Sequence, residues 1–272
     1  MEILSTENGV REVILESWQE FFKLSEKEFA KGPAYIYRGQ ANYAWPLLSS
    51  LDRLERRYSR RKNLSGNNPE YFECPPFTEE EHLNAFKWSI RGRRGQNPPR
   101  LSDDEYWTLG QHHGLATPLL DWTRSPFIAL FFAFDEEKCF VEDDKRSEPE
   151  CRGIYMLSTS TIETVAKNGV QSVRLLSSEN EANYRLISQA ALLIRMPRKT
   201  TLEHYVKEHF KGDDRGATFT KIKIPNKDRH GCLVMLNKMN INHMTLFPDI
   251  DGAARNVNSL WQPGHEELIA YV

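Results

Sequence analysis

The chain has 272 residues, of which 36 are Lys or Arg and 38 are Asp or Glu, so its formal net charge is −2. This balance excludes a basic field over the whole chain, of the kind that recruits nucleic acid, but it leaves local basic patches open. Hydrophobic residues make up 39% of the chain, which is typical of a globular protein and excludes a fully disordered one.

The N-terminal part of the chain predicts a helix followed by a short strand. Residues 11–31 carry an apolar stripe with helical spacing, which Gly32 and Pro33 interrupt. The β-rich run 34–38 predicts a strand that ends at Gly39. Residues 53–68 are predicted to be the basic end of a helix that leads into a polar loop.

Two capping boxes predict two helices in the middle of the chain. Thr78 with Glu81 marks the start of one helix, and Ser102 with Glu105 marks the start of the next. Residues 91–100 (RGRRGQNPPR) form the loop between them, and 110–114 and 121–125 are predicted turns. The run FIALFFAF after Pro126 is apolar on all sides, which predicts a deeply buried helix.

The second half of the chain predicts further strands and helices without any clear linker. Residues 135–150 form a charged surface loop, while 153–157 and 218–224 predict strands and 227–240 predicts a helix. No internal repeat or low-complexity tract interrupts this order. We therefore predict one α+β domain, with a mixed or antiparallel central sheet flanked by helices.

The N-terminus and the cysteines indicate where the protein works. MEILSTENGV lacks the basic and apolar regions of a signal peptide, and no run approaches 18 apolar residues. The four cysteines form no C-x-x-C pair, which favours reduced thiols over a disulfide framework or a zinc site. We expect a cytoplasmic protein without a membrane segment or a metal.

Arg38 is the first candidate functional residue. It stands at the C-terminal end of the short predicted strand, where its five guanidinium donors could bind phosphate or carboxylate. The neighbouring Gly39 would let the backbone turn or approach a ligand closely. The alternative is a structural arginine paired with a core acid such as Asp121, and the sequence leaves both interpretations open.

The polar stretch LGQHHGLATPLLDWTRSP directly precedes the all-apolar helix, whose N-terminus would favour an anion. Thr123 and Ser125 are candidate helix caps and also candidate phosphate or ribose ligands. His112 or His113 could act as a general base or a hydrogen-bond donor. In the structural alternative, one histidine satisfies a buried carbonyl group and Asp121 caps the turn.

The motifs YRGQ, LGQHHGLATPLLDWTRSPFIALFFAF and TLFPDIDG resemble those of the FRG domain family, which is named for a Phe/Tyr-Arg-Gly motif. The resemblance covers residues 30–255, so we expect an FRG domain there. A helical segment (1–29) precedes it, and a C-terminal tail (256–272) packs on the same domain. Pro118 replaces an arginine that is usual in the family, which removes one charged contact.

A weaker resemblance links the chain to ADP-ribosyltransferases, and it implies a related fold and NAD as a substrate. Those enzymes place an Arg-Gly pair at the end of their first strand, where the arginine holds an NAD phosphate or ribose. A hydroxyl-rich motif and a buried helix follow. Here Arg38-Gly39 would be the first element, and Thr123-x-Ser125 or the competing segment 158–160 (STS) would be the second.

The same resemblance implies a glutamate that stabilises the oxocarbenium-like transition state. No clear Glu-x-Glu stands on a late predicted strand. Glu179 and Glu181 have the spacing but lie in a polar stretch, and Gln189 and Asp249 are other candidates. Asp249 and Asp251 could also hold a divalent metal, but PDIDG more often forms an Asx-type turn with its glycine at positive φ, which we favour.

We expect an NAD-binding, ADP-ribosyltransferase-like effector that modifies a macromolecule, as a bacterial toxin or an anti-phage defence component. The candidate catalytic residues are Arg38, His112, His113, Asp121, Thr123 and Ser125. The candidate NAD-binding residues are Tyr37, Arg38, Gly39, Gln40, Thr117, Trp122 and Gln189. The basic stretches 53–62 and 91–100, read as loops, could contact an RNA, DNA or protein acceptor, and an antitoxin or regulator is a further candidate partner.

Two other functions stay open on the sequence. One is a non-catalytic module that binds a nucleotide or a phage component, which the missing glutamate favours. The other is a nuclease that uses His112 or His113 with Asp121, although no recognised nuclease spacing supports it.

Overall fold

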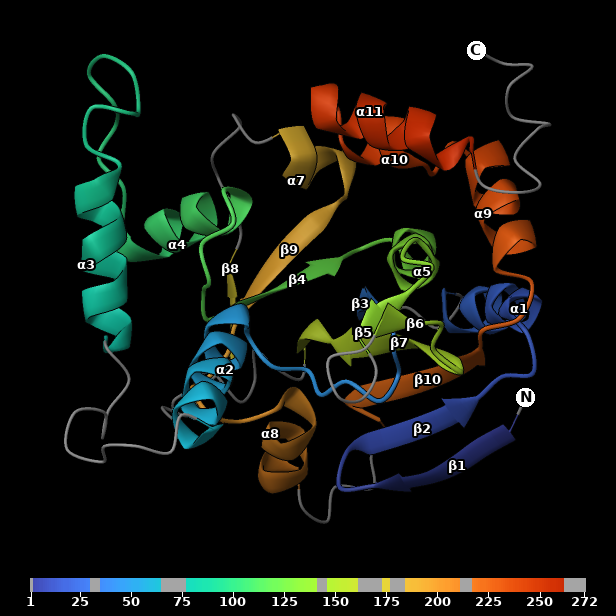
Figure 1. The fold of residues 1–272 in the computed structure, drawn as a ribbon. Coiled ribbons are helices and arrows are strands. Elements are labelled where there is room, and N and C mark those ends of the chain that lie inside the picture. The colour runs from blue at the N-terminus through green and yellow to red at the C-terminus, as the bar shows by residue number, and fades with distance from the viewer. Residues whose placement is uncertain are drawn as a thin grey trace.

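A mixed sheet of eight strands lies at the centre of the computed structural model, which describes residues 2–29, 35–64, 77–140, 146–160, 173–176, 184–210 and 217–261. In sheet order the strands are β1 (Glu2–Glu7), β2 (Val10–Ile14), β10 (Phe219–Pro225), β7 (Cys151–Ser158), β3 (Tyr35–Gln40), β4 (Leu119–Thr123), β9 (Ala191–Arg195) and β8 (Arg174–Leu176) (Figure 1). β2 and β10 are parallel, and the other neighbours are antiparallel. The predicted α+β class with a mixed sheet is confirmed.

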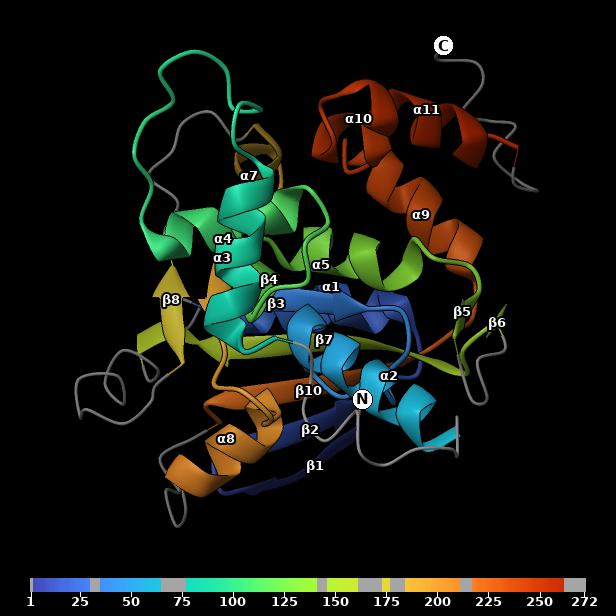
Figure 2. The same ribbon diagram turned by 60° about the vertical axis from the view of Figure 1, so that its left-hand side comes forward.

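Helices cover both faces of the sheet (Figures 1 and 2). On one face, α1 (Trp18–Phe29), α5 (Pro126–Phe134), α9 (Arg229–Lys238) and α10 (His243–Leu246) share a hydrophobic cluster with the middle strands. On the other face, α8 (Leu202–His209) packs on a second cluster. A third cluster joins α2 (Ser50–Leu64), α3 (Glu79–Ser89) and α4 (Asp103–His112) to β4 and β9. The remaining elements are α7 (Tyr184–Ser188), α11 (Ile250–Ser259) and the small β5 (Cys139–Phe140) and β6 (Arg146–Ser147) pair.

Local signals predicted several helix starts correctly. Both capping boxes are present, with Thr78 and Ser102 each accepting from the backbone of the glutamate three residues on. Ser125 caps α5 by accepting from the backbone N–H of Ile128, and α5 is buried as expected. The strands predicted at 153–157 and 218–224 and the helix predicted at 227–240 correspond to β7, β10 and α9.

The prediction of a helix over residues 11–31, and of a helical segment over 1–29, was wrong in its first half. β1 and β2 occupy this part, and α1 begins only at Trp18. Val13 is fully buried, and β2 pairs in parallel with β10 more than 200 residues later. That pairing is a non-local contact, so the helical spacing of the apolar residues could not reveal it.

Three loop predictions need correction. Residues 53–62 lie inside α2 and not in a loop. The turn predicted at 110–114 begins later, because α4 continues to His112, and 121–125 is mostly strand, since β4 runs to Thr123. β4 was missed because it is short and because Asp121 interrupts its apolar run. The C-terminal tail lies outside the described residues from residue 262 onward.

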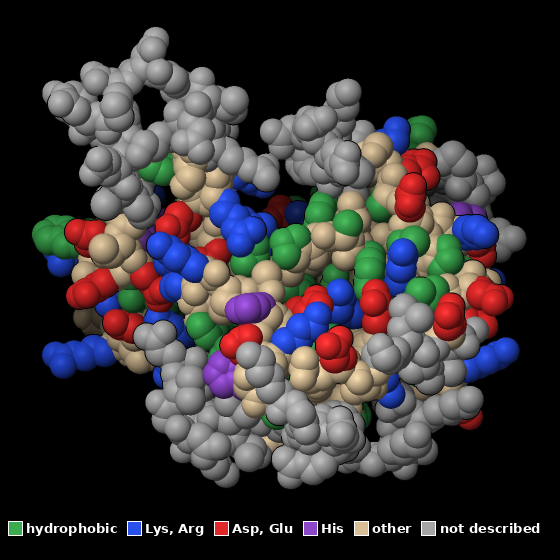
Figure 3. Space-filling view, turned by 90° about the horizontal axis from the view of Figure 1, so that it is seen from below, with side chains coloured by type: hydrophobic (Ala, Val, Ile, Leu, Met, Phe, Trp, Pro, Cys, Tyr) green, Lys and Arg blue, Asp and Glu red, His purple; other side chains and the backbone are tan. Residues whose placement is uncertain are grey.

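The surface carries both signs of charge. On the face seen in Figure 3, Lys and Arg side chains are interspersed with Asp and Glu side chains, as the net charge of −2 leads one to expect. Among the described helices, none combines the length and the apolar character that crossing a membrane requires.

Candidate functional site

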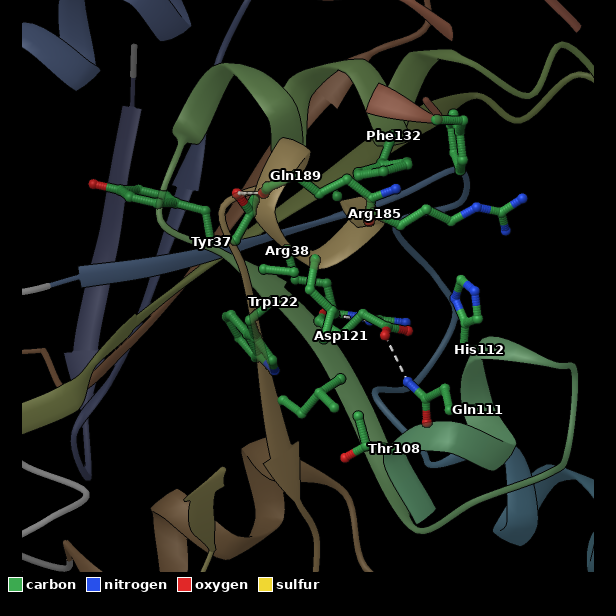
Figure 4. A pocket seen from close by; sticks show the side chains of 16 residues that line it. Tyr37, Arg38, Thr108, Gln111, His112, Asp121, Trp122, Phe132, Arg185 and Gln189 are labelled. Atoms are coloured by element: carbon green, nitrogen blue, oxygen red, sulfur yellow. Dashed lines mark hydrogen bonds and ion pairs between the residues drawn. The ribbon is translucent and has the colours of Figure 1, made fainter. Parts of the chain in front are cut away.

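A cavity of about 420 Å³ lies on the sheet face between α4, α5 and α7, over β4 and β9 (Figure 4). This volume falls in the range of small-molecule sites. The residues that line it are Tyr37, Arg38, Gly39, Thr108, Gln111, His112, Asp121, Trp122, Thr123, Phe132, Arg185, Leu186, Gln189, Ala191, Leu193 and Phe247. Eight of the predicted site residues are therefore brought together from β3, α4, β4 and the segment before β9.

Arg38 enters the cavity where two strands separate. β3 and β4 are paired only through Tyr37 and Thr123. Beyond that pair the Arg38 guanidinium replaces the missing ladder contact, since its Nη1 donates to the backbone carbonyl of Asp121 at 2.5 Å. The same nitrogen lies 3.9 Å from the Asp121 carboxylate. Arg38 therefore joins the two strands and also presents positive charge to the cavity.

The Arg38 guanidinium stays positively charged, and one of its hydrogen-bond donors has no partner among the described residues. Burial lowers the pKa of its guanidinium, while Asp121 and Tyr155 favour the charged form and oppose that shift. An arginine remains protonated under such shifts. Its Nε is buried and has no hydrogen-bond partner among the described residues. A buried donor without a partner is costly, so an acceptor atom of a ligand would be stabilised there.

Gly39 is required by the close approach of α5 to β3. A Cβ atom at this position would lie 1.8 Å from the Ala129 carbonyl oxygen and 2.7 Å from the Ala133 amide nitrogen. Both alanines are fully buried. The Arg-Gly pair thus has two separate functions, because the arginine lines the cavity and the glycine brings the buried helix against the strand.

The last turns of α4 form one wall of the cavity. Gln111 donates from Nε2 to the Asp121 carboxylate at 2.5 Å, and its carbonyl oxygen accepts from the Thr117 hydroxyl group. Burial lowers the pKa of His112, and the nearby His113 and Arg185 lower it further, against a smaller opposing effect of Asp249. His112 is therefore neutral near pH 7 and can accept a proton.

Arg185 on α7 provides a second guanidinium group at the opposite side of the cavity (Figure 4). Its Nε donates to the Asp249 carboxylate, and Asp251 lies 3.6 Å from its Nη2. This hydrogen bond raises the pKa of Arg185 and lowers that of Asp249. The Phe247 ring lies under the guanidinium at 5.6 Å, so Arg185 is held on two sides.

Some predicted site residues have other functions. Four of them do not line the cavity. Gln40 donates to the backbone of Asn42 and Trp45, and Thr117 donates to the Gln111 side chain. Ser125 is the N-cap of α5, and His113 is the C-cap of α4. Trp122 borders the cavity, and its indole ring packs in a core cluster with Leu120 and Leu192. The Tyr37 ring likewise belongs to the core around α5.

The candidates for a catalytic acid also change. Glu179 and Glu181 lie outside the described residues. Asp249 holds Arg185 and does not line the cavity, whereas Gln189 does. The competing segment 158–160 begins at the last residue of β7, and none of its residues lines the cavity. Asp121 is the single acid that lines the cavity within the described part of the chain.

PDIDG forms the start of a helix. Asp249 accepts from the backbone N–H of Gly252 at 2.9 Å, as in an Asx-type turn, but this bond caps α11 and Gly252 does not have positive φ. Both acids face Arg185. In the part of the chain that the structure describes, no three His, Cys, Asp or Glu side chains gather as a metal site would require.

Several cavity residues were missed by reasoning from the sequence. Gln111 and Thr108 lie on the same helical face as His112, so their spacing could have indicated them. Arg185, Phe132 and Phe247 come from three distant segments, and only the fold brings them together.

Comparison with known proteins gives one match. The family model described as the FRG domain matches residues 33–141, whereas no curated protein and no solved structure matches the chain. The matched stretch contains β3, α4, β4 and α5, and with them Arg38, Gln111, His112 and Asp121. Arg185 and Gln189 complete the cavity from beyond it. The chain therefore carries an FRG domain at residues 33–141.

Proposed function

We propose that the cavity binds NAD and that the protein transfers its ADP-ribose group to a macromolecule. The observation that carries this proposal is the pairing of Arg38 and Asp121 in one cavity, with 3.9 Å between the guanidinium and the carboxylate. The cation suits a phosphate, and the carboxylate suits the positive charge that develops on the ribose as nicotinamide leaves. We therefore propose Asp121 for the role of the glutamate, for which the sequence offers no clear Glu-x-Glu on a late strand.

The rest of the lining supports binding of a nucleotide. Arg38 and Arg185 provide two guanidinium groups for a pyrophosphate. Phe132 and Phe247 lie edge to face with centroids 6.1 Å apart and offer an apolar wall to a flat ring. Gln189 adds an amide side chain, whose nitrogen donates to the backbone of Leu246.

In the proposed reaction, the bond between ribose C1′ and the nicotinamide nitrogen breaks, and its electron pair stays on the nitrogen. Nicotinamide therefore leaves as a neutral molecule. An oxygen or nitrogen atom of the acceptor forms the new bond to C1′, and its proton passes to a ring nitrogen of neutral His112 and then to water. The compartment that we propose is the cytoplasm, because Cys151 and Cys232 are free thiols.

Transfer is tested by incubating the pure protein with NAD labelled in its adenylate part and with candidate RNA, DNA and protein acceptors. We expect label on one acceptor class and release of nicotinamide in equal amount. A protein that neither binds NAD in calorimetry nor releases nicotinamide with any acceptor would contradict the proposal.

The pH dependence of transfer tests His112. Because the pKa of His112 is lowered from the ordinary value of about 6.5, we expect activity to be constant above that pH and to fall in more acidic solution as the ring becomes protonated. In His112→Gln, activity should be low and should no longer fall in acidic solution. His113→Gln is the matched control, since His113 does not line the cavity, and its activity should still fall in acidic solution. If the activity of His112→Gln falls at acidic pH as that of the wild type does, His112 is excluded as the base.

Asp249 is proposed to position Arg185 for ligand binding. Asn caps a helix as well as Asp does, so Asp249→Asn should keep α11 while it removes the charge that holds Arg185. We expect the affinity for ADP-ribose to fall about 3- to 10-fold, in line with the modest energy of a half-exposed ion pair, and to fall further in Arg185→Ala. Calorimetric titration measures both changes. Unchanged affinity in both variants would place Arg185 outside the ligand site.

A second candidate is a module that binds the same ligand without turnover. It is favoured by the state of Asp121, whose carboxylate already accepts from Gln111 and is the single acid in the described lining. The two functions differ in one measurement. A sensor binds NAD or ADP-ribose through Arg38 and releases no nicotinamide over a long incubation, whereas the transferase releases it.

A further inference from the structure

We infer that the end of α3 and the loop after it form a docking surface for single-stranded nucleic acid. We call Trp88, Arg91, Arg93 and Arg100 the arginine platform. The Trp88 ring is 65% exposed in the last turn of α3, and the Arg91 guanidinium lies over it, 3.5 Å from the ring centroid. An exposed tryptophan with a stacked cation is an unusual surface feature, because most tryptophans are largely buried.

The three arginines of the platform are not neutralised. Each is exposed, and none makes an ion pair with another described residue. The fourth arginine of the loop, Arg94, has a structural function, since it donates to the Pro99 carbonyl group at 2.7 Å and contacts Tyr106. The loop conformation is thereby fixed, while the other three cations stay available.

The acids that lie nearest in the sequence are already paired. Asp103 accepts from Lys87 at 2.6 Å, and Asp104 binds Arg174 and Arg195. Glu105 closes the capping box with Ser102. These three acids therefore do not cancel the charge of the platform, which is a local cationic surface on a protein of net charge −2.

The combination of charge and aromatic ring favours single-stranded nucleic acid over other anions. Phosphates of the backbone would pair with the arginines, and an unpaired base would stack on Trp88 or on the Arg91 guanidinium. A duplex keeps its bases stacked inside, so it could use only the cations. An acidic peptide could likewise bind the cations but has no flat ring for Trp88.

The position of the platform links it to the cavity. The loop enters α4 at its N-terminal end, and Thr108, Gln111 and His112 line the cavity from its C-terminal half. Ten helical residues extend about 15 Å, which a strand at about 3.4 Å per nucleotide covers in four to five nucleotides. The inference deepens the proposed function, because it names a polynucleotide as the acceptor, but binding at the platform needs no NAD.

Binding is tested without NAD, by fluorescence anisotropy of a labelled 15-nucleotide polypyrimidine strand. We expect Trp88→Ala to weaken binding about 5- to 150-fold, because one stacking contact is lost, and Trp88→Phe to restore part of it. Arg91→Ala with Arg93→Ala should reduce the slope of log affinity against log salt by about 1.4, at about 0.7 per phosphate contact. Since these side chains are exposed, the variants should unfold at the temperature of the wild type.

The matched control is Lys227→Ala with Lys238→Ala, which removes two exposed charges near the two ends of α9. Equal weakening by this control, equal affinity for a duplex or polyglutamate, or no effect of Trp88→Ala would overturn the inference. The proposed function is judged separately. If the strand binds at the platform but neither the strand nor any other acceptor receives label from NAD, the transferase proposal fails and the docking surface stands. If label is transferred to another acceptor and the strand does not bind, the docking surface is wrong and the transferase proposal stands.

Discussion

Replacing Gly39 by alanine is expected to lower the free energy of unfolding by at least about 3 kcal/mol, which is a large part of the stability of an ordinary domain. The added Cβ would lie 1.8 Å from the Ala129 carbonyl oxygen. Because this atom belongs to the α5 backbone, no side-chain rotation can relieve the clash. The helix would have to move away from β3, and the core between them would open.

Urea unfolding followed by far-UV circular dichroism measures this loss. Gly114→Ala is the matched control, since Gly114 has φ of +83° and a Cβ atom added there would meet nothing within 4 Å. There only backbone strain of about 1–2 kcal/mol should appear. A loss at Gly39 no greater than the loss at Gly114 would show that α5 can shift at little cost.

Replacing Arg38 by alanine is expected to weaken ADP-ribose binding about 30- to 150-fold, which corresponds to about 2–3 kcal/mol for hydrogen bonds to a charged group. Arg38 lines the cavity and is held there by the Asp121 carbonyl group, and its Nε has no partner of its own among the described residues. Arg38→Lys keeps the charge but loses the planar fork, so it should recover only part of the affinity.

Isothermal titration with ADP-ribose measures this effect, and thermal unfolding of the same samples separates binding from folding. Lys238→Ala, an exposed change on α9, is the control and should leave affinity unchanged. If Arg38→Ala destabilises the protein but the folded fraction binds ADP-ribose like the wild type, Arg38 only joins β3 to β4. The structural alternative would then be correct.

The sequence by itself determined the features that depend on neighbours along the chain. The capping boxes at Thr78 and Ser102 satisfy backbone groups three residues away, and the apolar run after Pro126 can only be buried. Arg38, His112 and Asp121 could be selected because polar residues stood beside strongly apolar elements. The FRG motif lies in the same local stretches, which is why it could be identified.

Only the tertiary structure decided the features that depend on distant segments. β2 is a strand because β10 pairs with it in parallel, against the helical spacing of its own residues. The Trp122 ring packs in the core because side chains alternate along β4, so Asp121 lies on the opposite face of the strand and borders the cavity. Arg185 reaches the cavity because Asp249 and Phe247 hold it there, and no local pattern encodes a contact between residues more than 60 positions apart.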